Sequence, residues 1–214
     1  MTTAVAQGPR LYGCEGNVAE EDRARADIYG VLAHLFYSSP SASLLRTITD
    51  VRLIEGDADQ SPLAAAWHEL QKAARAADPE AIREEYDHAF ITAGRPPVFL
   101  YGSVYQTGFL MDKPLARLRE DLAQLGFARN LEVGEPEDHI SALCDVMRLL
   151  IIGTDDATPA ALSAQREFFM RHIAPWYERL CAAIDAAEQT DFYKKAAAFA
   201  KEFFYLEVQS FEIA

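Results

Sequence analysis

The stretch from Glu20 to Pro40, EEDRARADIYGVLAHLFYSSP, decides the fold. Its apolar residues recur at the three- and four-residue spacing of one face of an α-helix. These residues are Ile28, Val31, Leu32, Leu35 and Phe36. A first helix is therefore predicted from about Glu20 to Tyr37, and the Ser-Ser-Pro sequence that follows ends it.

The same spacing continues along the rest of the chain, and several helices carry a start signal. Ser61-Pro62 and Asp78-Pro79 each place a capping side chain before a proline that suits the first turn. Lys113-Pro114 opens a helix that Gly126 ends. The last helix is predicted from about Asp191 to Gln209.

Prolines mark further boundaries in the second half of the chain. Glu135-Pro136 is predicted to start a helix that runs to Gly153, with two acids in its first turn at the positive end of the helix dipole. Thr158-Pro159 starts another helix, and Pro175 should kink or split the stretch from Ala160 to Ala187.

The least regular part is residues 94–112, which include RPPVFLYGSVYQTGFLMD and are interpreted as an ordered loop. No pair of segments alternates as strands do, so we predict an all-α, single-domain bundle of about 8–10 helices. Its two helical halves would be joined by a hinge near Gly134–Pro136, and exchange of halves would allow a monomer or a domain-swapped dimer. Residues 1–18 are expected to be a flexible N-terminal segment, and residues 19–214 the helical domain.

Composition excludes several classes of protein. The 214 residues include 20 Lys and Arg against 33 Asp and Glu, a formal net charge of -13, which argues against a nucleic-acid partner. No apolar run approaches a membrane span and no secretory signal is visible, so we expect a cytoplasmic protein without stable membrane insertion. The three cysteines, Cys14, Cys144 and Cys181, form no metal-type cluster and are expected to be idle or buried thiols.

Catalytic signatures are missing from the chain, which has no nucleophile elbow and no phosphate-binding or dinucleotide-binding loop. Glu85 and His88 have the Glu-x-x-His spacing of a di-metal half-site, but no second half-site exists, so surface positions are the simpler interpretation. A helical metalloenzyme using Glu85 and His88 is kept as the alternative function. We otherwise expect no catalytic residue, no metal and no cofactor.

Two constellations suit the binding of a peptide. Tyr86 and Phe90 suit a core by default, but Tyr101 and Tyr105 in the proline-rich loop resemble a groove for an apolar, cationic peptide. In Glu135-Pro136-Glu137-Asp138-His139 the acids have a structural explanation, whereas His139 suits a structural or a ligand-binding role.

Read in order, these elements resemble the TorD/DmsD family of cytoplasmic chaperones for molybdoenzymes. The resemblance covers residues 20–208 and includes Phe168-Phe169, His172-Ile173-Ala174-Pro175-Trp176 and Asp191-Phe192-Tyr193. It implies an all-helical, non-catalytic chaperone that binds the twin-arginine signal peptide and the apo form of a molybdopterin-containing oxidoreductase. The twin-arginine translocase is a further candidate partner, and binding of guanine nucleotide is left open.

Carried over residue by residue, the resemblance implies a signal-peptide-binding surface. It would consist of Tyr86, Ala89, Phe90, Tyr101, Gly102, Ser103, Tyr105, Pro136, Asp138 and His139. Asp138 is the candidate partner of an arginine, and Tyr86, Phe90 and Tyr105 would pack against the apolar segment of the signal.

The loop pair Gly102-Ser103 resembles the dimethyl sulfoxide reductase branch of the family. Two features depart from the family pattern. Ala89 stands where leucine is usual, and three tyrosines stand where that branch often has tryptophan. These departures favour a smaller, more polar groove and a different client.

Overall fold

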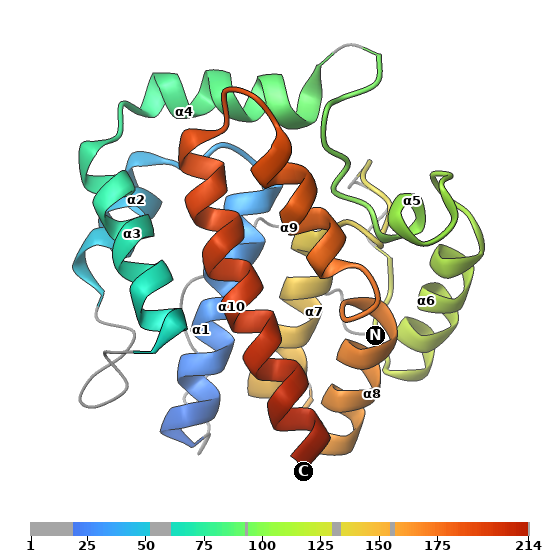
Figure 1. Cartoon of the computed structure of the whole chain (residues 1–214). Coiled ribbons are helices and arrows are strands. Elements are labelled where there is room, and N and C mark those ends of the chain that lie inside the picture. Colours follow the sequence, from blue (N-terminus) through green and yellow to red (C-terminus); the bar gives the residue numbers. More distant parts are fainter. Residues whose placement is uncertain (1–18, 52–60, 93, 130–133, 155–156, 214) are drawn as a thin grey trace. The chain divides into compact units, whose positions relative to one another are not determined.

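The computed structural model describes residues 19–51, 61–92, 94–129, 134–154 and 157–213. Within these ranges the chain forms ten α-helices and one π-helix (Figure 1). The described residues contain no strand, only isolated bridges between Tyr101 and His139 and between Thr154 and Ala157. The prediction of an all-α protein is confirmed. The expected flexible segment 1–18, with Cys14, lies outside the described residues.

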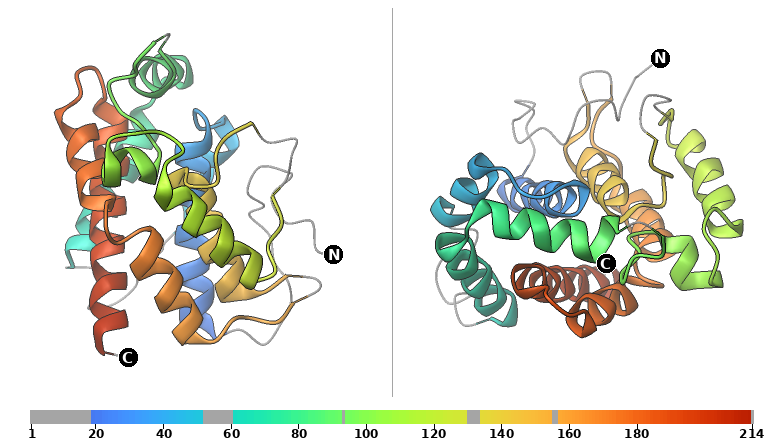
Figure 2. Two further views of the ribbon diagram at one scale, coloured as in Figure 1. Left: turned by 90° about the vertical axis from the view of Figure 1, so that its right-hand side faces the viewer. Right: turned by 90° about the horizontal axis from the view of Figure 1, so that it is seen from above.

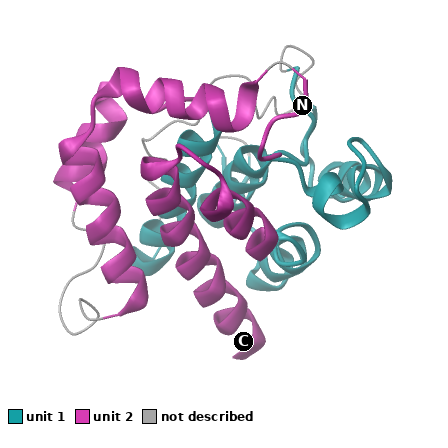
Figure 3. Cartoon of the chain, turned by 45° about the horizontal axis from the view of Figure 1, so that its top comes forward, with its two compact units in different colours: residues 1–37, 100–176 teal, residues 38–99, 177–214 magenta. Residues whose placement is uncertain are grey.

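The chain folds into two compact units, and neither is continuous in sequence (Figure 3). Unit 1 consists of Met1–Tyr37 and Leu100–Trp176, and unit 2 of Ser38–Phe99 and Tyr177–Ala214. The segment Gly134–Pro136 lies inside unit 1, so the units do not divide at the predicted hinge. A hinge at that segment and an exchange of halves between copies remain predictions.

Unit 1 is built around a pair of helices that lie side by side. Its helices are α1 (Glu20–Tyr37), α5 (Gly102–Thr107), α6 (Lys113–Gln124), α7 (Ile140–Ile152) and α8 (Leu162–His172). Helices α1 and α7 make the most extensive contact in the unit, and α8 packs against α7 and α6 (Figure 1). The Ser141 hydroxyl of α7 donates a buried 2.7 Å hydrogen bond to the Ala33 carbonyl of α1, which links the two helices.

Unit 2 is built around the long C-terminal helix. Its helices are α2 (Ala42–Asp50), α3 (Pro62–Ala76), α4 (Pro79–Tyr86), the π-helix η2 (Asp87–Ile91), α9 (Tyr177–Ala186) and α10 (Asp191–Ile213). Helix α10 packs against α3, α4 and α9, and Figure 2 shows α10 beside α9 in both views. The rings of Trp67 and Phe199 meet at 4.9 Å between α3 and α10, which places aromatic packing at the centre of this unit.

Local signals in the sequence predict many of the helix boundaries. Helix α1 has the predicted bounds, and the Ser61 and Asp78 side chains accept backbone N–H groups at the starts of α3 and α4. Gly126, just beyond α6, has a φ of 82°, which suits glycine. The chain turns between α8 and α9 at Pro175, as predicted.

Helix α8 begins at Leu162 instead of at Thr158-Pro159, and α10 extends to Ile213 instead of ending near Gln209. Two further boundaries differ from the prediction because the backbone is bonded to a distant segment. The predicted loop 94–112 contains α5, and the helix predicted from Glu135-Pro136 begins only at Ile140. The Leu100 carbonyl accepts the Ile140 N–H at 2.8 Å, and the Asp138 carbonyl accepts the Gly102 N–H at 2.9 Å. These bonds align two short segments side by side, so Glu135 to Asp138 do not join the helix.

Glu85 is half-buried instead of lying at the surface, because it caps a helix far away in sequence. Its carboxylate accepts the backbone N–H of Tyr193 at 2.6 Å and that of Phe192 at 3.1 Å. Both donors lie in the first turn of α10, where N–H groups have no partner within the helix. His88 is exposed, as expected.

We therefore expect Glu85→Ala to lower the free energy of unfolding by about 2 kcal/mol, because two helix N–H groups lose a charged acceptor. Urea titration measures this loss. The neighbouring Glu84 is exposed, so Glu84→Ala should change stability by less than about 0.5 kcal/mol. Equal effects of the two substitutions would contradict the capping role.

Candidate functional site

The N-terminus of α5 is held by Asp138, a residue from another part of unit 1. Tyr101 precedes α5 and its side chain makes no cap, so the first N–H groups of this helix need an outside acceptor. The Asp138 Oδ2 atom accepts the Ser103 N–H at 2.7 Å, and the Asp138 side chain is buried, with 3% of its surface exposed. Asp138 therefore caps α5 from a segment that is distant in sequence.

His139 begins α7 as its N-cap. Its Nδ1 atom accepts the Ser141 N–H at 3.2 Å, an arrangement that leaves the ring proton on Nε2. Burial lowers the pKa of His139 to about 4, so the ring is neutral at pH 7. The ring also packs edge-to-face on Tyr101, with centroids 5.1 Å apart. The geometry gives His139 a structural role.

Trp176 packs against α5. A Cβ atom at Gly102 would lie 3.0 Å from the Trp176 indole, so a larger residue would require the indole to shift. Tyr105 stacks on the same indole at 5.4 Å with an interplanar angle of 17°, and the indole N–H donates to the His172 carbonyl at 2.6 Å. Trp176 thus positions Tyr105, a role that the sequence alone did not reveal.

The acids of the segment 135–138 have different partners. Glu137 accepts hydrogen bonds from Nε and Nη2 of Arg119, and Arg129 lies 3.7 Å away. Burial raises the pKa of Glu137, but these arginines outweigh it and the pKa is lowered overall. Glu135 is exposed and accepts a hydrogen bond from the Tyr101 hydroxyl.

In unit 2, Tyr86 and Phe90 form an aromatic cluster with Tyr193. Ring centroids in the cluster are 5.0–5.6 Å apart, and Tyr86 and Phe90 are buried, as their default core role predicts. Ala89 lies in the π-helix, a form often found at functional sites, and is fully buried. Its carbonyl accepts the Val98 N–H from the following loop at 3.1 Å.

The ten residues implied by the resemblance thus divide between the units. Unit 2 holds Tyr86, Ala89 and Phe90; unit 1 holds Tyr101, Gly102, Ser103, Tyr105, Pro136, Asp138 and His139. Only Tyr101, Tyr105 and Pro136 are partly exposed, and the other seven residues are buried. Within unit 1, the buried residues hold the segments that carry the exposed ones.

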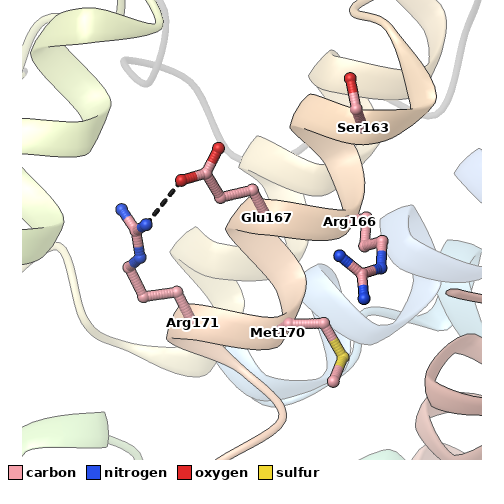
Figure 4. A pocket seen from close by; sticks show the side chains of 5 residues that line it. All are labelled: Ser163, Arg166, Glu167, Met170 and Arg171. Atoms are coloured by element: carbon pink, nitrogen blue, oxygen red, sulfur yellow. Dashed lines mark hydrogen bonds and ion pairs between the residues drawn. The ribbon is translucent and has the colours of Figure 1, made fainter. Parts of the chain in front are cut away.

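An open pocket lies along α8, lined by Ser163, Arg166, Glu167, Met170 and Arg171 (Figure 4). Arg171 is engaged with Glu167 at 2.5 Å and with Asp121 at 2.8 Å. In Figure 4 the guanidinium groups of Arg166 and Arg171 point to different sides of the helix. Arg166 and Arg171 are therefore not positioned to bind one anion together.

Neither a metal site nor a membrane span is found in the described ranges. They contain no group of three His, Cys, Asp or Glu side chains that could hold a metal ion. Glu85, the candidate ligand, uses both carboxylate oxygens to cap α10. Among the described helices, none combines the length and the apolar character needed to cross a bilayer.

A family model described as "Nitrate reductase delta subunit" matches residues 56–182, more than half of the chain. The chain belongs to this family, which is the TorD/DmsD family of redox enzyme maturation chaperones. It is accordingly a TorD/DmsD-family chaperone for molybdoenzyme maturation, with distant homologues. Members are chaperones and not enzymes, which confirms that expectation and sets the Glu85/His88 metalloenzyme aside.

Individual relatives are distant. "Chaperone protein TorD" of Vibrio cholerae is 28% identical over 179 residues, which cover 76% of this chain and 81% of the relative. "Probable Tat proofreading chaperone DmsD" of Haemophilus influenzae is 29% identical over 118 residues, covering 54% and 55%. The crystal structure of a "putative redox enzyme maturation protein" from Archaeoglobus fulgidus has a TM-score of 0.52 at 19% identity, covering 90% of this chain and 98% of the other, and it shows the same fold.

The capping role of Asp138 predicts a loss of stability that depends on the acceptor oxygen. Asp138→Ala should lower the free energy of unfolding by about 2 kcal/mol, because the Ser103 N–H loses its partner. Asp138→Asn keeps an acceptor and should cost less. Chemical denaturation measures both variants, and Glu120→Ala, at an exposed position of the same unit, is the control. A stability of Asp138→Ala equal to that of the control would refute the role.

Burial of neutral His139 predicts a dependence of stability on pH. Between the ordinary pKa of 6.5 and the lowered value of about 4, the unfolded chain binds a proton that the folded chain does not. Stability should therefore fall as pH drops, by about 2 kcal/mol from pH 7 to pH 5 for this residue. His139→Asn keeps a capping acceptor without titrating, so its urea midpoint should fall less over this range. His172, whose pKa is also lowered by burial, is common to both proteins. Identical pH dependence in both would contradict the prediction.

Proposed function

We propose that this protein acts in the cytoplasm by binding the twin-arginine signal peptide and the apo form of a molybdopterin-containing oxidoreductase. It delays export of the client until the cofactor is inserted and folding is complete. The expected client is a subunit of the dimethyl sulfoxide reductase family, and the twin-arginine translocase is a second partner.

The observation that carries the proposal is the surface around α5 in unit 1. There the partly exposed rings of Tyr101 and Tyr105 lie on a framework of buried residues, and the exposed carboxylate of Glu135 receives the Tyr101 hydroxyl. Aromatic rings suit an apolar segment, and a carboxylate suits a guanidinium group. A twin-arginine signal presents both chemistries in sequence. The net charge of -13 favours encounter with a cationic peptide.

The names of the relatives agree with this proposal. One is named for proofreading in the Tat pathway and another as the chaperone TorD. The residues matched by the family model include the loop with α5 and the segment 135–139, so the surface lies inside the shared region.

The proposal predicts that the purified protein binds a fluorescent synthetic leader with an Arg-Arg pair followed by a Leu/Ala stretch. Replacing the pair by Lys-Lys should weaken binding at least about tenfold, because lysine cannot make the paired hydrogen bonds of a guanidinium group. Fluorescence anisotropy measures both affinities. Equal affinity for the two leaders, or no binding of either, would overturn the proposed function.

A further inference from the structure

Three consecutive large apolar side chains are exposed between α5 and α6. The exposed fractions are 71% for Phe109, 45% for Leu110 and 67% for Met111. No other run of three such residues occurs among the described parts of the chain. Apolar surface gathered at one place commonly marks an interaction site. We call these three residues the apolar tip.

The apolar tip is held in its exposed position by hydrogen bonds. The Ser103 hydroxyl accepts the Met111 N–H at 3.2 Å, and the Thr107 hydroxyl lies 3.4 Å from the Phe109 N–H. Met111 has a φ of 57°, a left-handed conformation that costs free energy for a residue other than glycine. Ser103 is the residue whose own N–H is held by Asp138. The tip is therefore fixed to the same framework as the segment 135–139.

Among the acids of the segment 135–138, one exposed carboxylate remains available for a cation. Glu137 is engaged by Arg119, and Asp138 is buried with Oδ2 committed to the Ser103 N–H. Glu135 is exposed, and no described cation pairs with it. Its carboxylate is oriented by the Tyr101 hydroxyl, which lies next to the start of α5.

Both features are tied to the start of α5. The Met111 N–H is bonded to the Ser103 hydroxyl, and Ser103 is the second residue of α5. Tyr101, whose hydroxyl orients Glu135, immediately precedes the same helix. An extended peptide rises about 3.3 Å per residue, so one leader with arginines followed by an apolar stretch can contact both features.

We propose that Glu135 binds the arginine pair of the leader and that the apolar tip binds the apolar stretch. This inference rests on the proposed function. It assigns the charge contact to Glu135 instead of Asp138, and it adds a contact surface outside the ten residues implied by the family resemblance.

Two single substitutions in the full-length protein, each measured with altered leaders, test the two contacts. The probes are the fluorescent Arg-Arg leader, its Lys-Lys form and a form whose Leu/Ala stretch is replaced by Ser/Gly. Glu135→Gln should weaken binding of the Arg-Arg leader about tenfold and affect the Lys-Lys leader less. Phe109→Ser should weaken the Arg-Arg leader about tenfold and leave the Ser/Gly form unchanged.

The matched controls are Glu120→Gln and Leu162→Ser, which change an exposed acid and an exposed apolar residue elsewhere in unit 1. Both should bind like the original protein. If each variant binds like its control, the inference is overturned while the proposed function stands, because the original protein still discriminates Arg-Arg from Lys-Lys. If the original protein itself binds the Arg-Arg and Lys-Lys leaders equally, the proposed function is overturned.

Photo-crosslinking tests which segment each part of the leader contacts. A benzophenone placed beside the arginine pair should label the segment 134–139, and one placed in the apolar stretch should label residues 108–113, as read by mass spectrometry of the digested protein. The reverse assignment, or the same labelled segment for both probes, would overturn the proposal.

Discussion

The hydrogen bond from the Ser103 N–H to the Asp138 carboxylate is the constraint on which the rest of unit 1's loop structure depends. Helix α5 is too short to be stable alone and has no capping side chain of its own. Asp138 supplies the acceptor, and the backbone bond from Gly102 to Asp138 fixes the register between two distant segments. With the helix start fixed, Gly102 lies against Trp176 and the Ser103 hydroxyl reaches Met111. One buried carboxylate thereby organises a short helix, an aromatic stack and an exposed loop.

Unit 2 uses the same solution at α10, where Glu85 accepts two backbone N–H groups of the first turn. In both units a carboxylate that is distant in sequence satisfies a helix start, so part of the net charge of -13 serves the interior. The acids near the candidate site therefore fall into two groups. Asp138 and Glu85 each cap a helix, whereas Glu135 is exposed to solvent.

Local signals predicted most of the fold, and distant contacts account for the errors. Ser61 and Asp78 cap the helices that they precede, and Pro175 separates α8 from α9, because these effects act within one turn. The predicted start of α7 was wrong by several residues. The segment that was expected to begin the helix is instead hydrogen-bonded to residues 100–103 through Asp138 and Ile140. Spacing also placed Glu85 at the surface, since no local pattern shows that α10 needs its carboxylate. For the candidate site, the sequence predicted the segments but could not separate the buried Asp138 from the exposed Glu135, because the residues that surround each come from distant parts of the chain.

The most direct test of this account is native-state hydrogen exchange at the Ser103 amide, measured with and without the Arg-Arg leader. If Asp138 remains the cap of α5 while Glu135 binds the arginines, the Ser103 amide should be as well protected, or better protected, in the complex. Faster exchange of this amide in the complex would mean that Asp138 leaves the helix to bind an arginine, and it would contradict the account.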